Sequence, residues 1–155
     1  MTTLDIEKAF VKNIRVARNN FVFPNIYLGD FECDVLEITK SMYAYEYEVK
    51  ISVSDFKADK KKKGKFDNPR TNYFYYIVPK GLIDIDMLPD YAGLIYCEPI
   101  TCGYYSKERG NYEIKKLYFS IVKSAPKIKK EKMCDNTFRY LLQKVYYRFI
   151  NKYIE

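Results

Sequence analysis

Histidine is absent from this chain of 155 residues, and its four cysteines, at positions 33, 97, 102 and 134, form no Cys-x-x-Cys pair. Without histidine, hydrolases that rely on an imidazole base beside a serine or cysteine nucleophile are excluded. The cysteine spacing and the missing histidine also argue against a zinc site and indicate reduced thiols. Any catalysis must therefore depend on carboxylates, lysine, tyrosine or a metal ion.

Long apolar runs are absent too. No stretch of 18 or more apolar residues occurs, and charged residues such as Asp5, Glu7 and Lys8 interrupt the N-terminal segment. We therefore expect neither a membrane-spanning helix nor an export signal. The apolar fraction of 48% is that of a globular chain, and the length suits one domain over residues 1–155. A cytoplasmic protein, of a bacterium or of a phage-infected host cell, is expected.

Positive charge is in excess, with 27 Lys and Arg residues against 20 Asp and Glu residues and a net charge of +7. Such an excess favours a polyanionic partner, of which nucleic acid is the commonest. Solubility is the alternative explanation for the same charge. DNA is the partner we expect, although charge alone does not distinguish DNA from RNA.

The periodicity of apolar residues predicts a mixture of helices and strands. A first helix over residues 2–18 begins at a Thr2–Asp5 cap, and a last helix, with a long apolar stripe, begins at Asp135 or Asn136. Between them we predict strands over Phe21–Leu28, Cys33–Thr39, Tyr43–Ser52, Asn72–Val78 and the segment AGLIYC, a short helix from Ser52 or Ser54 to Gly64, and a β-hairpin within residues 102–122. This order predicts an α/β (α+β) fold with a mixed central sheet flanked by helices, plus a C-terminal β-hairpin and helix.

The second and third predicted strands are joined by about three residues, so we expect an antiparallel hairpin centred on Ser41. In this register Asp34 faces Glu48, with Cβ atoms ~5 Å apart. Two carboxylates this close repel each other, whereas a divalent cation such as Mg²⁺ accepts both as ligands. Lys50 projects from the same face, where its amine can stabilise the charge of a phosphate.

The same alternation of charged and apolar residues has a simpler explanation. A half-exposed antiparallel strand also places charged residues on one face and apolar residues on the other. A slip of one residue in the register would also separate Asp34 from Glu48. Spacing alone therefore leaves a functional site and an ordinary solvent face both open.

Longer motifs resemble a known family. Glu7 in the first helix, Asp34 within FECDVLEIT, and Glu48 to Lys50 within YEYEVKISVSDFKAD occur in the order typical of the PD-(D/E)XK nuclease superfamily. The segments EVKISVSDFKADKK, NYFYYIVPKGLI and LPDYAGLIY are similar to its MmcB-like, DNA-repair-associated branch. The resemblance covers residues 5–96 and implies a restriction-endonuclease-like αβββαβ core.

The resemblance implies a nuclease that hydrolyses DNA phosphodiester bonds in DNA repair, replication or phage DNA processing. Its cofactor would be Mg²⁺, for which Mn²⁺ would substitute. Asp34, Glu48 and the backbone carbonyl of Val49 are the implied metal ligands, Glu7 lies near the metal, and Lys50 positions the attacking water. Cys33 departs from the branch, in which a small or basic residue often precedes the aspartate, and this difference affects the contacts around the phosphate.

Basic and polar residues that follow the motif are expected to contact nucleic acid. They are Lys57, Lys60, Lys61, Lys62, Lys63, Lys65, Arg70, Asn72 and Tyr73. The alternative for the lysine run is a solvated helix end. Asp55 is expected either to support Lys50 or to place charge at the helix N-terminus, and Asp59 to be an ordinary surface residue. Tyr104 and Tyr105, at the expected hairpin tip, are candidates for stacking on a base.

Two other functions fit the sequence. One is a catalytically inactive nucleic-acid-binding module on the same fold, and the other is a phage protein-interaction factor with a tyrosine-rich surface. The C-terminal helix is expected either to close the core or to form a homodimer.

Overall fold

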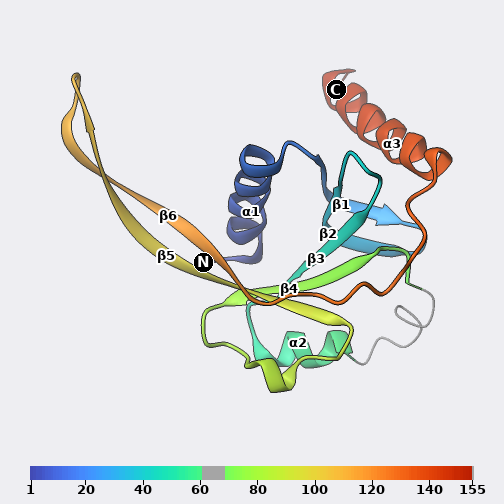
Figure 1. The fold of residues 1–155 in the computed structure, drawn as a ribbon. Coiled ribbons are helices and arrows are strands. Elements are labelled where there is room, and N and C mark those ends of the chain that lie inside the picture. Colours follow the sequence, from blue (N-terminus) through green and yellow to red (C-terminus); the bar gives the residue numbers. More distant parts are fainter. Residues whose placement is uncertain (61–68, 155) are drawn as a thin grey trace.

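The protein has an α+β fold in which helices lie on both sides of a mixed β-sheet (Figure 1). The computed structural model describes residues 1–60 and 69–154. Its elements, in chain order, are α1 (Thr3–Arg18), β1 (Phe21–Leu28), β2 (Phe31–Ile38), β3 (Ala44–Val49), α2 (Val53–Lys60), β4 (Tyr73–Pro79), the 3₁₀ turn η1 (Ile85–Met87), β5 (Ala92–Ser106), β6 (Gly110–Lys123) and α3 (Asp135–Ile154).

The six strands follow one another in the sheet in chain order. β1, β2 and β3 pair antiparallel, β3, β4 and β5 pair parallel, and β5 and β6 form an antiparallel hairpin. Parallel neighbours need crossover connections, and the segments with α2 and η1 supply them. β3, β4 and β5 therefore run in the same direction, and β3 and β4 end close to each other in the sheet.

α1 covers one face of this sheet. Thr2 and Asp5 form a reciprocal cap at its N-terminus, as predicted. Its buried residues Ile6, Phe10 and Ile14 pack against odd-numbered residues of the central strands, among them Tyr47. Because side chains alternate along a strand, the even-numbered residues of β3 point to the other face.

α2 lies against that other face (Figure 1). Its Phe56 is 1% exposed and packs with Phe74 and Tyr76 of β4. Glu46 and Glu48 of β3 share this face and are buried, so the polar side predicted for the third strand is covered by protein rather than by solvent.

The predicted hairpin within residues 102–122 is wrong in its extent. The segment AGLIYC and the first arm of the hairpin are one continuous strand of 15 residues, β5. Pro99, which suggests a break, is tolerated because β4 pairs with β5 only as far as Cys97, which leaves one edge of β5 unpaired beyond it. The hairpin therefore extends beyond the rest of the sheet (Figure 1).

The buried apolar contacts of α3 with the sheet lie in its first half, and further along Arg148 donates hydrogen bonds to the carbonyls of Pro24 and Asn25 in β1. Leu141 is fully buried against β1 and β2, and Phe138 is partly buried beside it. Further along the apolar stripe, Tyr146, Phe149 and Tyr153 are exposed. No helix among the described residues is long and apolar enough to cross a membrane.

Candidate active site

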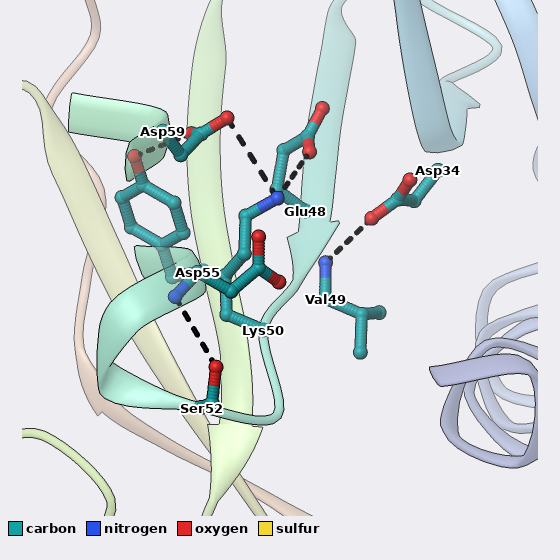
Figure 2. A network of polar contacts seen from close by, with 8 residues as sticks. Asp34, Glu48, Val49, Lys50, Ser52, Asp55 and Asp59 are labelled. Carbon is teal, nitrogen blue, oxygen red and sulfur yellow. Dashed lines mark hydrogen bonds and ion pairs between the residues drawn. The ribbon is translucent and has the colours of Figure 1, made fainter. Parts of the chain in front are cut away.

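The β2–β3 hairpin has the predicted register. Val35 pairs with Tyr47 and Leu36 with Glu46. The last pair of this register is Val35 and Tyr47, and Asp34 and Glu48 are the next residues along the two strands. Figure 2 shows both side chains at the end of β3, with Lys50 beside Glu48.

Asp34 is held by the backbone of the neighbouring strand. Its Oδ2 accepts a hydrogen bond of 2.8 Å from the N–H of Val49. Burial and then the negative charge of Glu48 raise the pKa of Asp34 from 3.8 to about 6, against the lowering effects of Val49 and Lys50. The shift indicates that Asp34 and Glu48 lie close enough to repel each other, which is the arrangement expected at a cation site.

Lys50 lies between two carboxylates (Figure 2). Its Nζ is 3.2 Å from Oε2 of Glu48 and 3.7 Å from Oδ1 of Asp59, and its side chain is 8% exposed. Burial alone would lower the pKa of Lys50, but the charges of Glu48 and Asp59, with smaller contributions from Asp34 and Asp55, leave it raised. Lys50 is therefore a fixed positive charge and a hydrogen-bond donor at neutral pH, and not a base.

Asp59 belongs to this network, although the sequence predicts a surface residue. It is 2% exposed, and its Oδ2 accepts a hydrogen bond of 2.9 Å from the hydroxyl of Tyr76. The burial of Asp59 could have been predicted from helical spacing, because Asp59 follows the buried Phe56 by three residues and so shares its inward face. Asp55, by contrast, is exposed, and its backbone N–H bonds to Ser52 Oγ at the start of α2. Asp55 therefore acts on Lys50 only through its charge.

Glu7 reaches the same region from α1. It is buried, its charge contributes to the raised pKa of Asp34, and its Oε2 accepts a hydrogen bond of 3.2 Å from Asn25. Asn25 of β1 stands opposite Asp34 in the sheet, because its neighbours pair with the neighbours of Asp34. Its φ of 48° is left-handed, a conformation that asparagine tolerates better than most residues. Sequence reasoning missed Asn25.

The carboxylate oxygens at this site match part of the ligand set that a hard divalent cation needs. Asp34 and Glu48 offer carboxylate oxygens from neighbouring strands, and a cation between them would reverse the repulsion that raises the pKa of Asp34. Within residues 1–60 and 69–154, however, no group of three or more His, Cys, Asp or Glu residues is arranged to hold a metal ion. The ligand roles of Glu7 and of the Val49 carbonyl therefore stay predictions.

Some of the polar residues predicted to contact nucleic acid form contacts within the protein. Asn72 is 1% exposed; it accepts a hydrogen bond from Ala44 N–H and donates to the carbonyls of Lys129 and Glu131. Its amide therefore connects three chain segments, and its expected contact with nucleic acid stays a prediction.

Arg70 and Tyr73 also have partners within the protein. Arg70 donates a hydrogen bond of 3.1 Å to the Leu28 carbonyl, and its guanidinium lies against Gly29, whose φ is 68°. Tyr73 stacks on Tyr45 at a ring distance of 4.5 Å.

Most of the lysines predicted to contact nucleic acid lie outside the part of the chain that the structure describes. Lys57 is exposed on α2. Lys61, Lys62, Lys63 and Lys65 lie outside the described residues, as does the side chain of Lys60. Their proposed contacts with nucleic acid remain predictions.

Comparisons with known proteins address the fold. No family model matches the chain, and no curated protein matches it. The chain is similar to a solved structure, the SPO1766 protein of unknown function from Silicibacter pomeroyi, with a TM-score of 0.64 and 16% identity. The similarity covers 98% of this chain and 88% of that one. At this identity it is evidence for a shared fold alone.

Proposed function

We propose that this protein is a metal-dependent nuclease of PD-(D/E)XK type that hydrolyses DNA phosphodiester bonds. The observation that carries the proposal is the meeting of Asp34, Glu48 and Lys50 at the end of β3, where burial and Glu48 raise the pKa of Asp34 (Figure 2). The order of the first elements, helix, three strands, helix and strand, supports a restriction-endonuclease-like core. DNA repair, replication or phage DNA processing, in a bacterial or phage-infected cell, is the setting that the sequence motifs favour.

The residues of the site have distinct tasks in this proposal. Asp34 and Glu48 would hold a Mg²⁺ or Mn²⁺ ion, which supplies a Lewis acid that offsets phosphate charge and makes water a better nucleophile. Lys50, kept charged by Glu48 and Asp59, donates a hydrogen bond to the phosphate or to the attacking water. The cover of protein over this face limits the water around these charges and strengthens their effect.

A cleavage assay tests the proposal. Duplex, single-stranded, flapped and branched DNA would be incubated with Mg²⁺ or Mn²⁺ and either the wild type, Glu48→Gln or Lys50→Ala. We expect the wild type to cut at least one substrate and each variant to lose activity by about 100-fold or more. Glu32→Gln is the matched control, because Glu32 is an exposed residue of β2 whose side chain accepts a hydrogen bond from the Tyr27 hydroxyl. A wild type that cuts no substrate, or variants as active as the control, would contradict the proposal.

A second candidate is a nucleic-acid-binding module that keeps the fold and does not cut. The ion pair of 3.2 Å between Lys50 and Glu48 favours it, because Lys50 then occupies an oxygen that a metal would need. Calorimetric titration with Mn²⁺ separates the two candidates. Binding that Asp34→Asn and Glu48→Gln abolish supports the nuclease, and the absence of any binding supports the module.

The homodimer also remains a proposal. The exposed apolar residues in the second half of α3 would suit a second copy of the chain, and a dimeric nuclease can cut both strands of a duplex.

A further inference from the structure

A groove between α1 and the β5–β6 hairpin carries a strong excess of positive charge. The hairpin groove, as we call it, has a volume of about 440 Å³. Four lysines line it, Lys8, Lys12, Lys115 and Lys116, and Asp5 is the single acidic residue among its lining. The lysines are exposed, and among the described residues none of them forms an ion pair. The carboxylate of Asp5 accepts the Thr2 N–H in the helix cap.

This charge is continuous with the region of the carboxylates. Lys8 and Lys12 also line a second groove, of about 700 Å³, on the β1 side of α1, together with Arg15, Asn25 and Glu7. Glu7 accepts a hydrogen bond from Asn25, which stands opposite Asp34 in the sheet, so this second groove opens beside the candidate active site. A ridge of cationic residues on α1 therefore leads from the hairpin groove to Glu7.

The hairpin extends the charged surface away from the sheet (Figure 1). At about 3.3 Å per residue, its arm from Pro99 to Ser106 spans about 23 Å, which corresponds to about seven nucleotides at 3.4 Å each. Tyr105 is 72% exposed near the tip. The amine of Lys116 lies 3.4 Å from the hydroxyl of Tyr104 and so connects the groove to the tyrosines of this arm.

We propose that the hairpin groove and the α1 ridge bind the phosphodiester backbone of a nucleic acid and lead it to Asp34 and Glu48. Lysines spread along a groove match the repeated charge of such a backbone. This inference deepens the proposed function, because it assigns the surface that holds the substrate. It also adds α1 and β6 to the lysines that follow α2 as surfaces predicted to bind the substrate.

A binding assay without metal tests this surface apart from cleavage. The fluorescence anisotropy of a labelled duplex, and of one of its strands, would be followed in EDTA from about 50 to 200 mM salt. The variants are Lys115→Ala/Lys116→Ala on β6 and Lys8→Ala/Lys12→Ala on α1. Lys40→Ala/Lys152→Ala is the matched control, because it also removes two exposed lysines, neither of which lines either of these two grooves.

We expect each groove variant to raise the Kd on the order of tenfold and to reduce the salt dependence by about two released counterions. The control should bind like the wild type. The α1 variant leaves the hairpin unchanged and should fold, because alanine is a strong helix former and the substituted positions are exposed. It therefore tests the surface even if the β6 variant misfolds. The lower of the two Kd values, for the duplex or for its single strand, shows which form of nucleic acid the surface prefers.

Three results would overturn the inference: a wild type that binds neither nucleic acid, groove variants that bind like the wild type, or a control that loses as much affinity as they do. Failure of the proposed function gives a different pattern. If groove-dependent binding persists but no substrate is cut in Mg²⁺ or Mn²⁺, the nuclease proposal fails and the binding surface stands.

Discussion

The charge state of Asp34 depends on the fold. Burial and Glu48 raise its pKa from 3.8 to about 6. The folded protein therefore keeps a proton on Asp34 at pH values at which the unfolded chain has lost it. The resulting stabilisation is complete below about pH 3.8 and is lost as the pH rises through about 6.

Replacing Asp34 with asparagine should remove this pH dependence. In EDTA at about pH 7.5, we predict that Asp34→Asn increases the free energy of unfolding by about 1–3 kcal/mol, because the amide still accepts the Val49 N–H but carries no charge. Near pH 4 the difference should shrink toward zero, since Asp34 is then protonated in the folded wild type. Urea unfolding at both pH values measures the effect. A variant that is less stable than the wild type at neutral pH would contradict the assigned repulsion.

Asp59 is the second residue with a testable role, since it positions Lys50 and helps to keep it charged. We predict that Asp59→Asn reduces cleavage on the order of tenfold at neutral pH and moves the alkaline limb of the pH–rate profile to lower pH. The reason is that Lys50 loses one of the two charges that contribute most to its raised pKa.

The matched control for Asp59 is Asp55→Asn on the same helix. Asp55 is exposed, and its charge is the last of the contributions to the pKa of Lys50, so its removal should leave the profile almost unchanged. Equal shifts in the two variants would mean that Asp59 has no special role.

At the scale of secondary-structure elements, Asn72 ties the segment before α3 to the start of β4 and β3. Its side chain makes three hydrogen bonds with Ala44, Lys129 and Glu131, and its backbone carbonyl accepts the Ile128 N–H. This segment is otherwise an irregular connection between β6 and α3. The course of this connection toward α3 therefore depends in part on one buried amide.

Removing that amide should loosen the connection. We predict that Asn72→Ala lowers the free energy of unfolding by about 2–4 kcal/mol, because it leaves buried backbone groups without partners. Asn13→Ala is the control, since Asn13 is exposed on α1, and it should change stability by less than about 0.5 kcal/mol. Urea unfolding followed by circular dichroism compares the two. Equal stability of both variants would show that the connection needs no such tie.

At the scale of the whole molecule, charge and exposed apolar surface are unevenly distributed. The four lysines of the hairpin groove, separated by about a hundred positions in the sequence, come together where β6 passes α1. Exposed apolar residues are numerous along α3, among them Tyr146, Phe149 and Tyr153 in its second half. The proposed nucleic-acid surface and the proposed dimer surface thus lie on different elements.

The sequence by itself determined the elements and the pairing of the central hairpin. Alternation along β2 and β3 and the short turn between them are local properties, and they are sufficient to set the register that brings Asp34 and Glu48 to the same end of the hairpin. The capping residues of α1 are local in the same sense. For this reason the first half of the chain followed the prediction closely.

Only the tertiary structure decided which charged side chains are buried and what they contact. The pairing of Asp59 with Lys50, the hydrogen bonds of Asn72, the approach of Asn25 to Glu7 and the lysine groove all join elements that are distant or separately folded in the sequence. The extent of β5 depended on where β4 ends. Pattern and propensity describe one segment at a time, whereas these contacts depend on how the helices pack against the two faces of the sheet.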